Sequence, residues 1–105
     1  MHTITLGFTI TSVLENAKVF ANGVPVQCFP IGNGKFTGGF HDALIQGGST
    51  LEIQFHLYGL NGTDYKIEYK FLDNGTEEED TNNSSPIERT IISNLKAVEI
   101  VRFTA

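Results

Sequence analysis

The chain has no tryptophan, one cysteine and three prolines in 105 residues. Because a single cysteine, Cys28, cannot form an intrachain disulfide, the chain fits a reducing compartment or a secreted protein stabilised by its core alone. No apolar run approaches the length of a membrane span. The first residues, MHTITLGFTITS, alternate in polarity and lack the basic and apolar regions of a signal peptide. The sequence leaves the compartment open: we expect a cytoplasmic protein or a processed, secreted one.

Basic residues are also scarce. The chain has seven Lys and Arg residues and twelve Asp and Glu residues, which gives a net charge of −5. The excess comes from one stretch without a basic residue, which contains Asp73, Glu77, Glu78, Glu79 and Asp80. Outside it, acidic and basic residues are equal in number. Since no basic stripe is available for phosphate groups, we expect neither nucleic-acid binding nor electrostatic attachment to anionic membranes.

Alternating polarity dominates the residues that are present. Between Leu51 and Leu72 every second residue is apolar in two separate runs, which predicts two half-buried strands. Residues 59–64, which are rich in turn formers, separate the runs. The two strands either pair directly, with Phe55 opposite Ile67 or Tyr69, or belong to different sheets joined by a crossing loop.

The remaining strands are predicted from shorter patterns. Residues 3–13 alternate, and the Asn22-Gly23 pair between apolar runs predicts a two-residue hairpin. Pro25 cannot donate a ladder hydrogen bond, so residues 24–29 are expected to form an edge strand. Residues 31–48 contain six glycines and predict short strands or one turn of helix. Two strands close the chain, and the last, in residues 95–103, is apolar on both faces and is expected to be buried on both.

These patterns predict one all-β domain over residues 1–105. Seven or eight short strands with frequent turns favour an antiparallel β-sandwich, and a small β-barrel is the alternative. The strand count and length are similar to those of the immunoglobulin and fibronectin type III architectures. The paired cysteines and core tryptophan of true immunoglobulin domains are missing.

Catalytic patterns are weak. Cys28 together with His41 or His56 and with Asp42 would supply the parts of a thiol triad, but nothing in their spacing connects them. A small enzyme built on these residues is therefore only the third interpretation, and we expect the protein not to be an enzyme.

Two surface regions are candidates for ligand binding. Asp73, Asn74, Glu77, Glu78, Glu79 and Asp80 concentrate oxygen ligands that suit calcium, although their spacing does not match an EF-hand. Tyr58 and His56 are expected to point outward from their strand, where a sugar could stack on the tyrosine ring. A lectin-like or calcium-assisted ligand-binding domain is therefore the second interpretation.

The first interpretation is a non-enzymatic binding or assembly module. Edge strands are templates for pairing with another chain. We expect the edge strand at residues 24–29 and the loops at 32–48 and 73–86 to contact a protein partner or a second copy of the chain.

Overall fold

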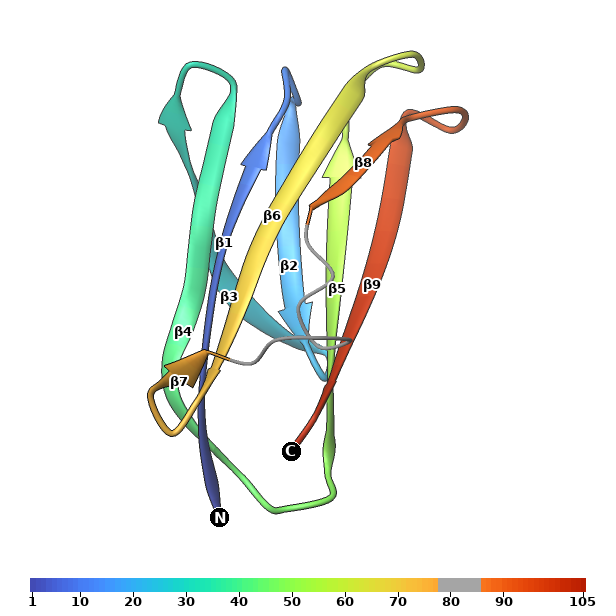
Figure 1. Cartoon of the computed structure of the whole chain (residues 1–105). Helices are drawn as coiled ribbons and strands as arrows, with labels where there is room; N and C mark the ends of the chain where they lie inside the picture. The colour runs from blue at the N-terminus through green and yellow to red at the C-terminus, as the bar shows by residue number, and fades with distance from the viewer. Residues whose placement is uncertain (78–85) are drawn as a thin grey trace.

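The computed structural model describes residues 1–77 and 86–105, and all of its regular elements are strands (Figure 1). No helix in these residues is long and apolar enough to cross a membrane. The strands are β1 (His2–Thr11), β2 (Asn16–Ala21), β3 (Val24–Gly32), β4 (Lys35–Ile45), β5 (Thr50–Tyr58), β6 (Asp64–Asp73), β7 (Thr76–Glu77), β8 (Ile87–Thr90) and β9 (Lys96–Thr104).

The strands form a single antiparallel sheet in the order β7-β6-β1-β4-β3-β2-β5-β9, and β8 also pairs with β6. The sheet curls until it is nearly closed into a barrel. The prediction of an all-β antiparallel domain is confirmed, but the two-sheet sandwich is wrong. The reason lies in β3, which pairs with β2 through Val24–Val26 and with β4 through Gln27–Gly32. This one strand joins what would otherwise be two separate sheets.

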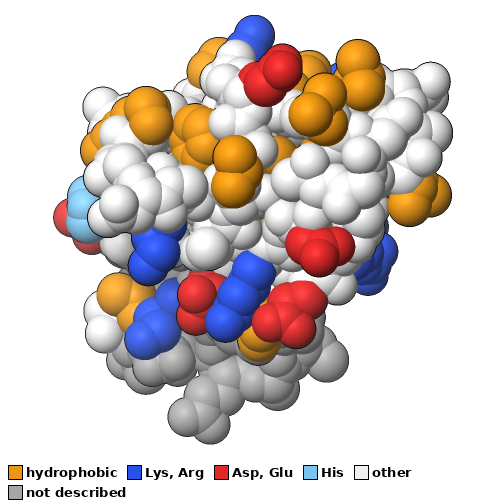
Figure 2. Space-filling view, turned by 90° about the horizontal axis from the view of Figure 1, so that it is seen from above, with side chains coloured by type: hydrophobic (Ala, Val, Ile, Leu, Met, Phe, Trp, Pro, Cys, Tyr) orange, Lys and Arg blue, Asp and Glu red, His pale blue; other side chains and the backbone are white. Residues whose placement is uncertain are grey.

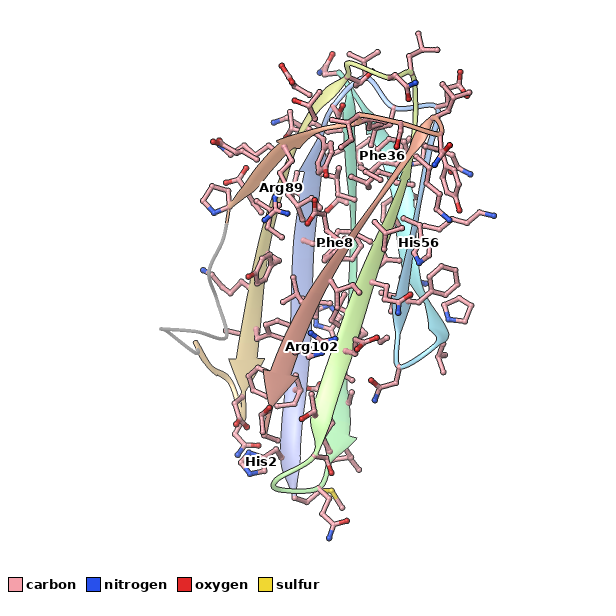
Figure 3. The ribbon with its side chains drawn as sticks, turned by 90° about the vertical axis from the view of Figure 1, so that its right-hand side faces the viewer. His2, Phe8, Phe36, His56, Arg89 and Arg102 are labelled. Atoms are coloured by element: carbon pink, nitrogen blue, oxygen red, sulfur yellow. The ribbon has the colours of Figure 1, made fainter. Side chains whose placement is uncertain are left out.

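The inward residues of each strand fill the barrel. The predicted alternation in β1 is confirmed, since Ile4, Leu6, Phe8 and Ile10 are all buried. Phe8 packs edge-to-face against Phe55 of β5 with ring centroids 5.3 Å apart, in the arrangement that aromatic pairs favour. Figure 3 shows Phe8 inside the barrel, between the strands of its two sides.

The predicted Asn22-Gly23 hairpin is confirmed, and two further Asn-Gly pairs form turns of the same kind. Asn22-Gly23, Asn33-Gly34 and Asn74-Gly75 join β2 to β3, β3 to β4 and β6 to β7. In each pair both residues have positive φ, from 47° at Asn22 to 83° at Gly75. Asparagine and glycine tolerate this left-handed region, which is why the pair favours two-residue hairpins.

Of the two arrangements left open for residues 51–57 and 65–71, the direct hairpin is wrong. β5 pairs with β2 and β9, while β6 pairs with β1, β7 and β8. Phe55 therefore lies opposite Val19 and Glu99. Alternation defines which side of a strand faces the core and does not define its neighbours. The loop at residues 59–63 passes from one side of the barrel opening to the other, in line with the crossing alternative.

Two other predictions about strands need correction. Residues 24–29 lie in the middle of the sheet, so β3 is not an edge strand. Pro25 is tolerated because the first half of β3 pairs on one side only, and Pro30 because the second half pairs only on the other side. Residues 35–45 form one long strand, β4, without a helical turn.

The last strand is also not buried on both faces. Among the described strands β9 pairs only with β5, and Val98 and Ile100 are 45% and 46% exposed on its outer face. Glu99 points inward and is buried. Its carboxylate accepts a hydrogen bond from Tyr65 of β6 at 2.5 Å and lies 3.5 Å from the guanidinium of Arg89 on β8. Side chains therefore join β9 to β6 and β8 where the barrel is open.

Candidate functional site

A groove opens where β3 and β4 separate, and we refer to it as the β3–β4 groove. Its volume is about 430 Å³, and it is lined mainly by apolar side chains. Val24, Pro25 and Val26 of β3 form one wall, and Phe40 and Ala43 of β4 form the other. Leu51 of β5 also lines it. This volume is within the range of ligand-binding pockets.

The two strands approach each other closely just before they separate. A Cβ added to Gly38 of β4 would lie 1.8 Å from the carbonyl oxygen of Gln27 on β3. Gln27 pairs with Gly39, and this is the last pair between the two strands. Glycine is required because the β3 backbone takes the place of a side chain. The adjacent glycines therefore define one end of the groove.

A β-bulge then follows in β4. Ile4 pairs with Ala43 and Leu6 with Phe40, so Thr5 of β1 faces two residues, His41 and Asp42. Asp42 has φ 55°, and its N–H donates to the Thr5 hydroxyl at 3.1 Å. Bulges bend a strand and increase its twist. We attribute the separation of β4 from β3 to this bulge.

The groove has unpaired backbone on both walls. Beyond Gly39, β4 pairs only with β1, and before Gln27, β3 pairs only with β2, within the described part of the chain. On the side of β4 that faces the groove, the backbone of residues 40–45 is therefore not paired with another described strand. On the β3 wall Pro25 has no N–H to offer. The β4 wall keeps both donors and acceptors and is the better template for an added strand.

The predicted sugar-binding residues lie on the outer face of β5, away from the groove. His56 is on the outside of the barrel (Figure 3), and its ring packs edge-to-face on Phe20 at 5.1 Å. Partial burial, and then the charge of Lys96, lower the pKa of His56 below its usual range. The Nζ of Lys96 lies 5.3 Å from the ring centroid of Tyr58. A sugar stacking on this face of the tyrosine would have to displace the lysine.

The predicted calcium ligands are placed in part. Both carboxylate oxygens of Asp73 lie within 2.9 Å of His2 Nδ1, and Asn74 Oδ1 accepts from the Thr3 N–H at 2.8 Å. These two residues thus bind the start of β1. Glu77 is in β7, opposite Leu72. Glu78, Glu79 and Asp80 lie outside the described residues, and those that are described contain no group of three His, Cys, Asp or Glu side chains able to hold a metal ion.

The residues considered for thiol catalysis are on neighbouring strands. Cys28 lies opposite Gly38, and His41 and Asp42 form the bulge of β4. Burial raises the pKa of the Cys28 thiol to about 11. A nucleophilic cysteine needs a lowered pKa, because the thiolate is the reactive form. The environment of Cys28 is typical of a small residue in a core.

Sequence reasoning missed the groove and the Tyr65–Glu99–Arg89 cluster. The signal for the groove was the Gly38-Gly39 pair, because consecutive glycines within a strand mark a close approach or a bulge. The signal for the cluster was Glu99, a single acid in the apolar run of the last strand.

Searches against protein-family models, curated proteins and solved structures found no match to this chain. The function is therefore inferred from its own residues.

Proposed function

We propose that this domain is a non-enzymatic protein-binding module that takes an extended segment of a partner into the β3–β4 groove. The observation that carries the proposal is the unpaired backbone of β4 beside an apolar groove. An extended peptide that adds to an open strand edge gains main-chain hydrogen bonds, while alternate side chains enter pockets.

Both parts of this recognition mode have support. The exposed backbone of residues 40–45 supplies the hydrogen-bonding edge. Phe40, Ala43 and Leu51 supply an apolar lining for small or branched side chains of the segment. Leu44, on the other side of β4, is 71% exposed and lies next to this edge. Its side chain does not line the groove.

The lectin-like alternative has less support. The position of Lys96 over Tyr58 covers the ring face that a sugar would use. Asp73 and Asn74 already bind His2 and Thr3, so a calcium ion would have to compete with these contacts. Protein binding is therefore the better supported function.

A peptide selection tests the proposal. Nine-residue random peptides displayed on phage are selected on the wild-type domain, and the affinity of the best synthetic peptide is measured by calorimetry. Ala43→Trp, which fills the groove, is expected to weaken binding by about tenfold or more. Leu44→Trp is the matched control, because the Leu44 side chain is next to Ala43 in β4 but is turned away from the groove. The Leu44→Trp variant should bind the peptide nearly as well as the wild type.

Backbone methylation of the same peptide separates strand addition from other modes. Single N-methyl groups are introduced at successive positions, each of which removes one N–H donor. In an added strand, alternate N–H groups face β4, so affinity should fall at every second position. Uniform sensitivity, or equal loss in Ala43→Trp and Leu44→Trp, would contradict the proposal. Light scattering of the free domain shows whether a second copy is the partner.

A further inference from the structure

Exposed aliphatic side chains gather at one end of the barrel. The β1–β2, β5–β6 and β8–β9 connections all lie at the upper end in Figure 1. They carry Val13, Leu60, Ile92 and Leu95, which are 86%, 66%, 85% and 55% exposed. We call these four residues the apolar tip. Figure 2 looks down on this end and shows hydrophobic side chains spread over much of the face, with a band of charged side chains along one side.

The apolar tip is held on a hydrogen-bonded frame. The Gly59 N–H donates to the Leu95 carbonyl at 3.1 Å, and the Leu95 N–H donates to Asn61 Oδ1 at 3.0 Å. Gly62 N–H donates to the Ile91 carbonyl at 2.6 Å. The β5–β6 and β8–β9 loops are thereby tied together, which fixes the backbone that carries Leu60, Ile92 and Leu95.

The turn before β9 holds Leu95 in a backbone conformation that leucine disfavours. Ser93 and Lys96 bridge a two-residue turn in which Asn94 has φ 59° and Leu95 has φ 54°. The Asn-Gly turns at 22–23, 33–34 and 74–75 also have positive φ at both residues, with glycine in second place. Leucine is strained in the left-handed region because of its Cβ. The protein thus accepts strain to present an exposed leucine, and such strain is concentrated at functional sites.

The composition of the apolar tip favours a lipid surface over a protein. Hot spots of protein interfaces are rich in Trp, Tyr and Arg that fit into pockets, whereas these four residues are all aliphatic and project from separate loops. A bilayer accepts such projections without a complementary pocket. Directly below the tip are Tyr58 and Lys96, with the lysine over the ring. Tyrosine and lysine side chains each have an apolar part and a polar end, so they are suited to the headgroup region.

From these observations we propose that the apolar tip docks the domain onto a lipid bilayer. Val13, Leu60, Ile92 and Leu95 would enter the boundary between headgroups and acyl chains, and Tyr58 and Lys96 would lie among the headgroups. The net charge of −5 gives anionic lipids no advantage, so the surface is a neutral phospholipid one. This inference does not depend on the β3–β4 groove.

Co-sedimentation with phosphatidylcholine vesicles tests the proposal. The wild type should sediment with them, and Ile92→Ser should lower the partition coefficient by about tenfold. Val98→Ser is the control, because Val98 is also exposed but lies on the outer face of β9. It should bind like the wild type. Leu95→Gly should raise the melting temperature, since it relieves the strained turn, and should nevertheless bind vesicles more weakly.

Several results would overturn the proposal. One is a wild-type protein that stays in the supernatant, and another is equal loss in Ile92→Ser and Val98→Ser. Binding that requires added phosphatidylserine would show an electrostatic mode instead. If light scattering finds an oligomer that Ile92→Ser dissociates while vesicle binding is unchanged, the apolar tip is a contact between copies of the chain.

Discussion

The Tyr65 hydroxyl on β6 donates a hydrogen bond of 2.5 Å to the Glu99 carboxylate on β9, across the open side of the barrel. Glu99 is buried, whereas its other partner, Arg89, has a side chain that is 67% exposed. The tyrosine is therefore the main buried partner of this carboxylate. An inward-facing charge on an end strand also discourages pairing with other chains.

Tyr65→Phe should destabilise the domain by roughly 1–3 kcal/mol, because it leaves a buried carboxylate oxygen without its donor. The free energy of unfolding in urea measures this loss. Tyr58→Phe, on the outer face, is the matched control and should change stability by about 0.5 kcal/mol or less. Adding Glu99→Leu to Tyr65→Phe should recover part of the loss. A Tyr65→Phe protein as stable as Tyr58→Phe would show that the cluster contributes nothing to stability.

The same pair makes stability depend on pH at the alkaline end. Burial, and then the hydrogen bond to Glu99 and its charge, raise the pKa of Tyr65 above the usual 10. Above pH 10 the unfolded chain loses this proton while the folded protein keeps it, so folding stability should fall as pH rises. Urea midpoints measured between about pH 9 and pH 11 should fall less steeply in Tyr65→Phe than in the wild type. Parallel curves would contradict this assignment.

Gly38, like its neighbour Gly39, has no room for a side chain. A Cβ there would lie 1.8 Å from the Gln27 carbonyl oxygen, which is backbone and cannot rotate away. Gly38→Ala is expected to cost about 3 kcal/mol or more, as overpacking against a fixed neighbour does. Gly7 of β1 is the control, because a Cβ at Gly7 would meet nothing within 4 Å. Gly7→Ala should fold with nearly wild-type stability, and equal effects of the two changes would be inconsistent with this packing.

Local features of the fold were predictable from sequence. The alternation of Ile4 to Ile10 located a buried face, and three of the four Asn-Gly pairs located hairpins, because both signals depend on residues close together in the chain. The fourth pair, Asn61-Gly62, lies in the β5–β6 connection, which is not a hairpin. The neighbours of β5 and β6 were not predictable. The alternation in β5 and β6 shows which face of each strand is buried but not which strand lies beside it. The direct hairpin and the crossing loop were therefore equally compatible with the sequence.

The site was less predictable than the fold. Pro25 correctly marked missing strand pairing, but the sequence could not say that pairing is missing on only one side of β3. The β3–β4 groove lies beside a bulge in β4 at His41 and Asp42. Aspartate tolerates the positive φ that Asp42 adopts, but the sequence does not show which aspartate will adopt it. The apolar tip combines residues from loops far apart in sequence, and each aliphatic residue alone is ordinary on a protein surface.

Cys28 should react slowly with thiol reagents in the folded protein. Burial raises its pKa to about 11, so the thiolate is rare at neutral pH. Relative to the unfolded chain, the rate of alkylation by iodoacetamide near pH 8 should be lower by about a hundredfold, because the rate follows the thiolate fraction. The rate should then rise steadily toward pH 11, as long as the protein stays folded.

The control is the same chain in urea, in which Cys28 should react at the rate of an ordinary cysteine. Cys28→Ala should leave both peptide affinity and vesicle binding unchanged, because the thiol has no part in either proposal. A folded protein that reacts faster than the unfolded chain would mean that Cys28 is activated. Since activation requires a lowered pKa, that result would support the thiol-enzyme interpretation and argue against the binding module.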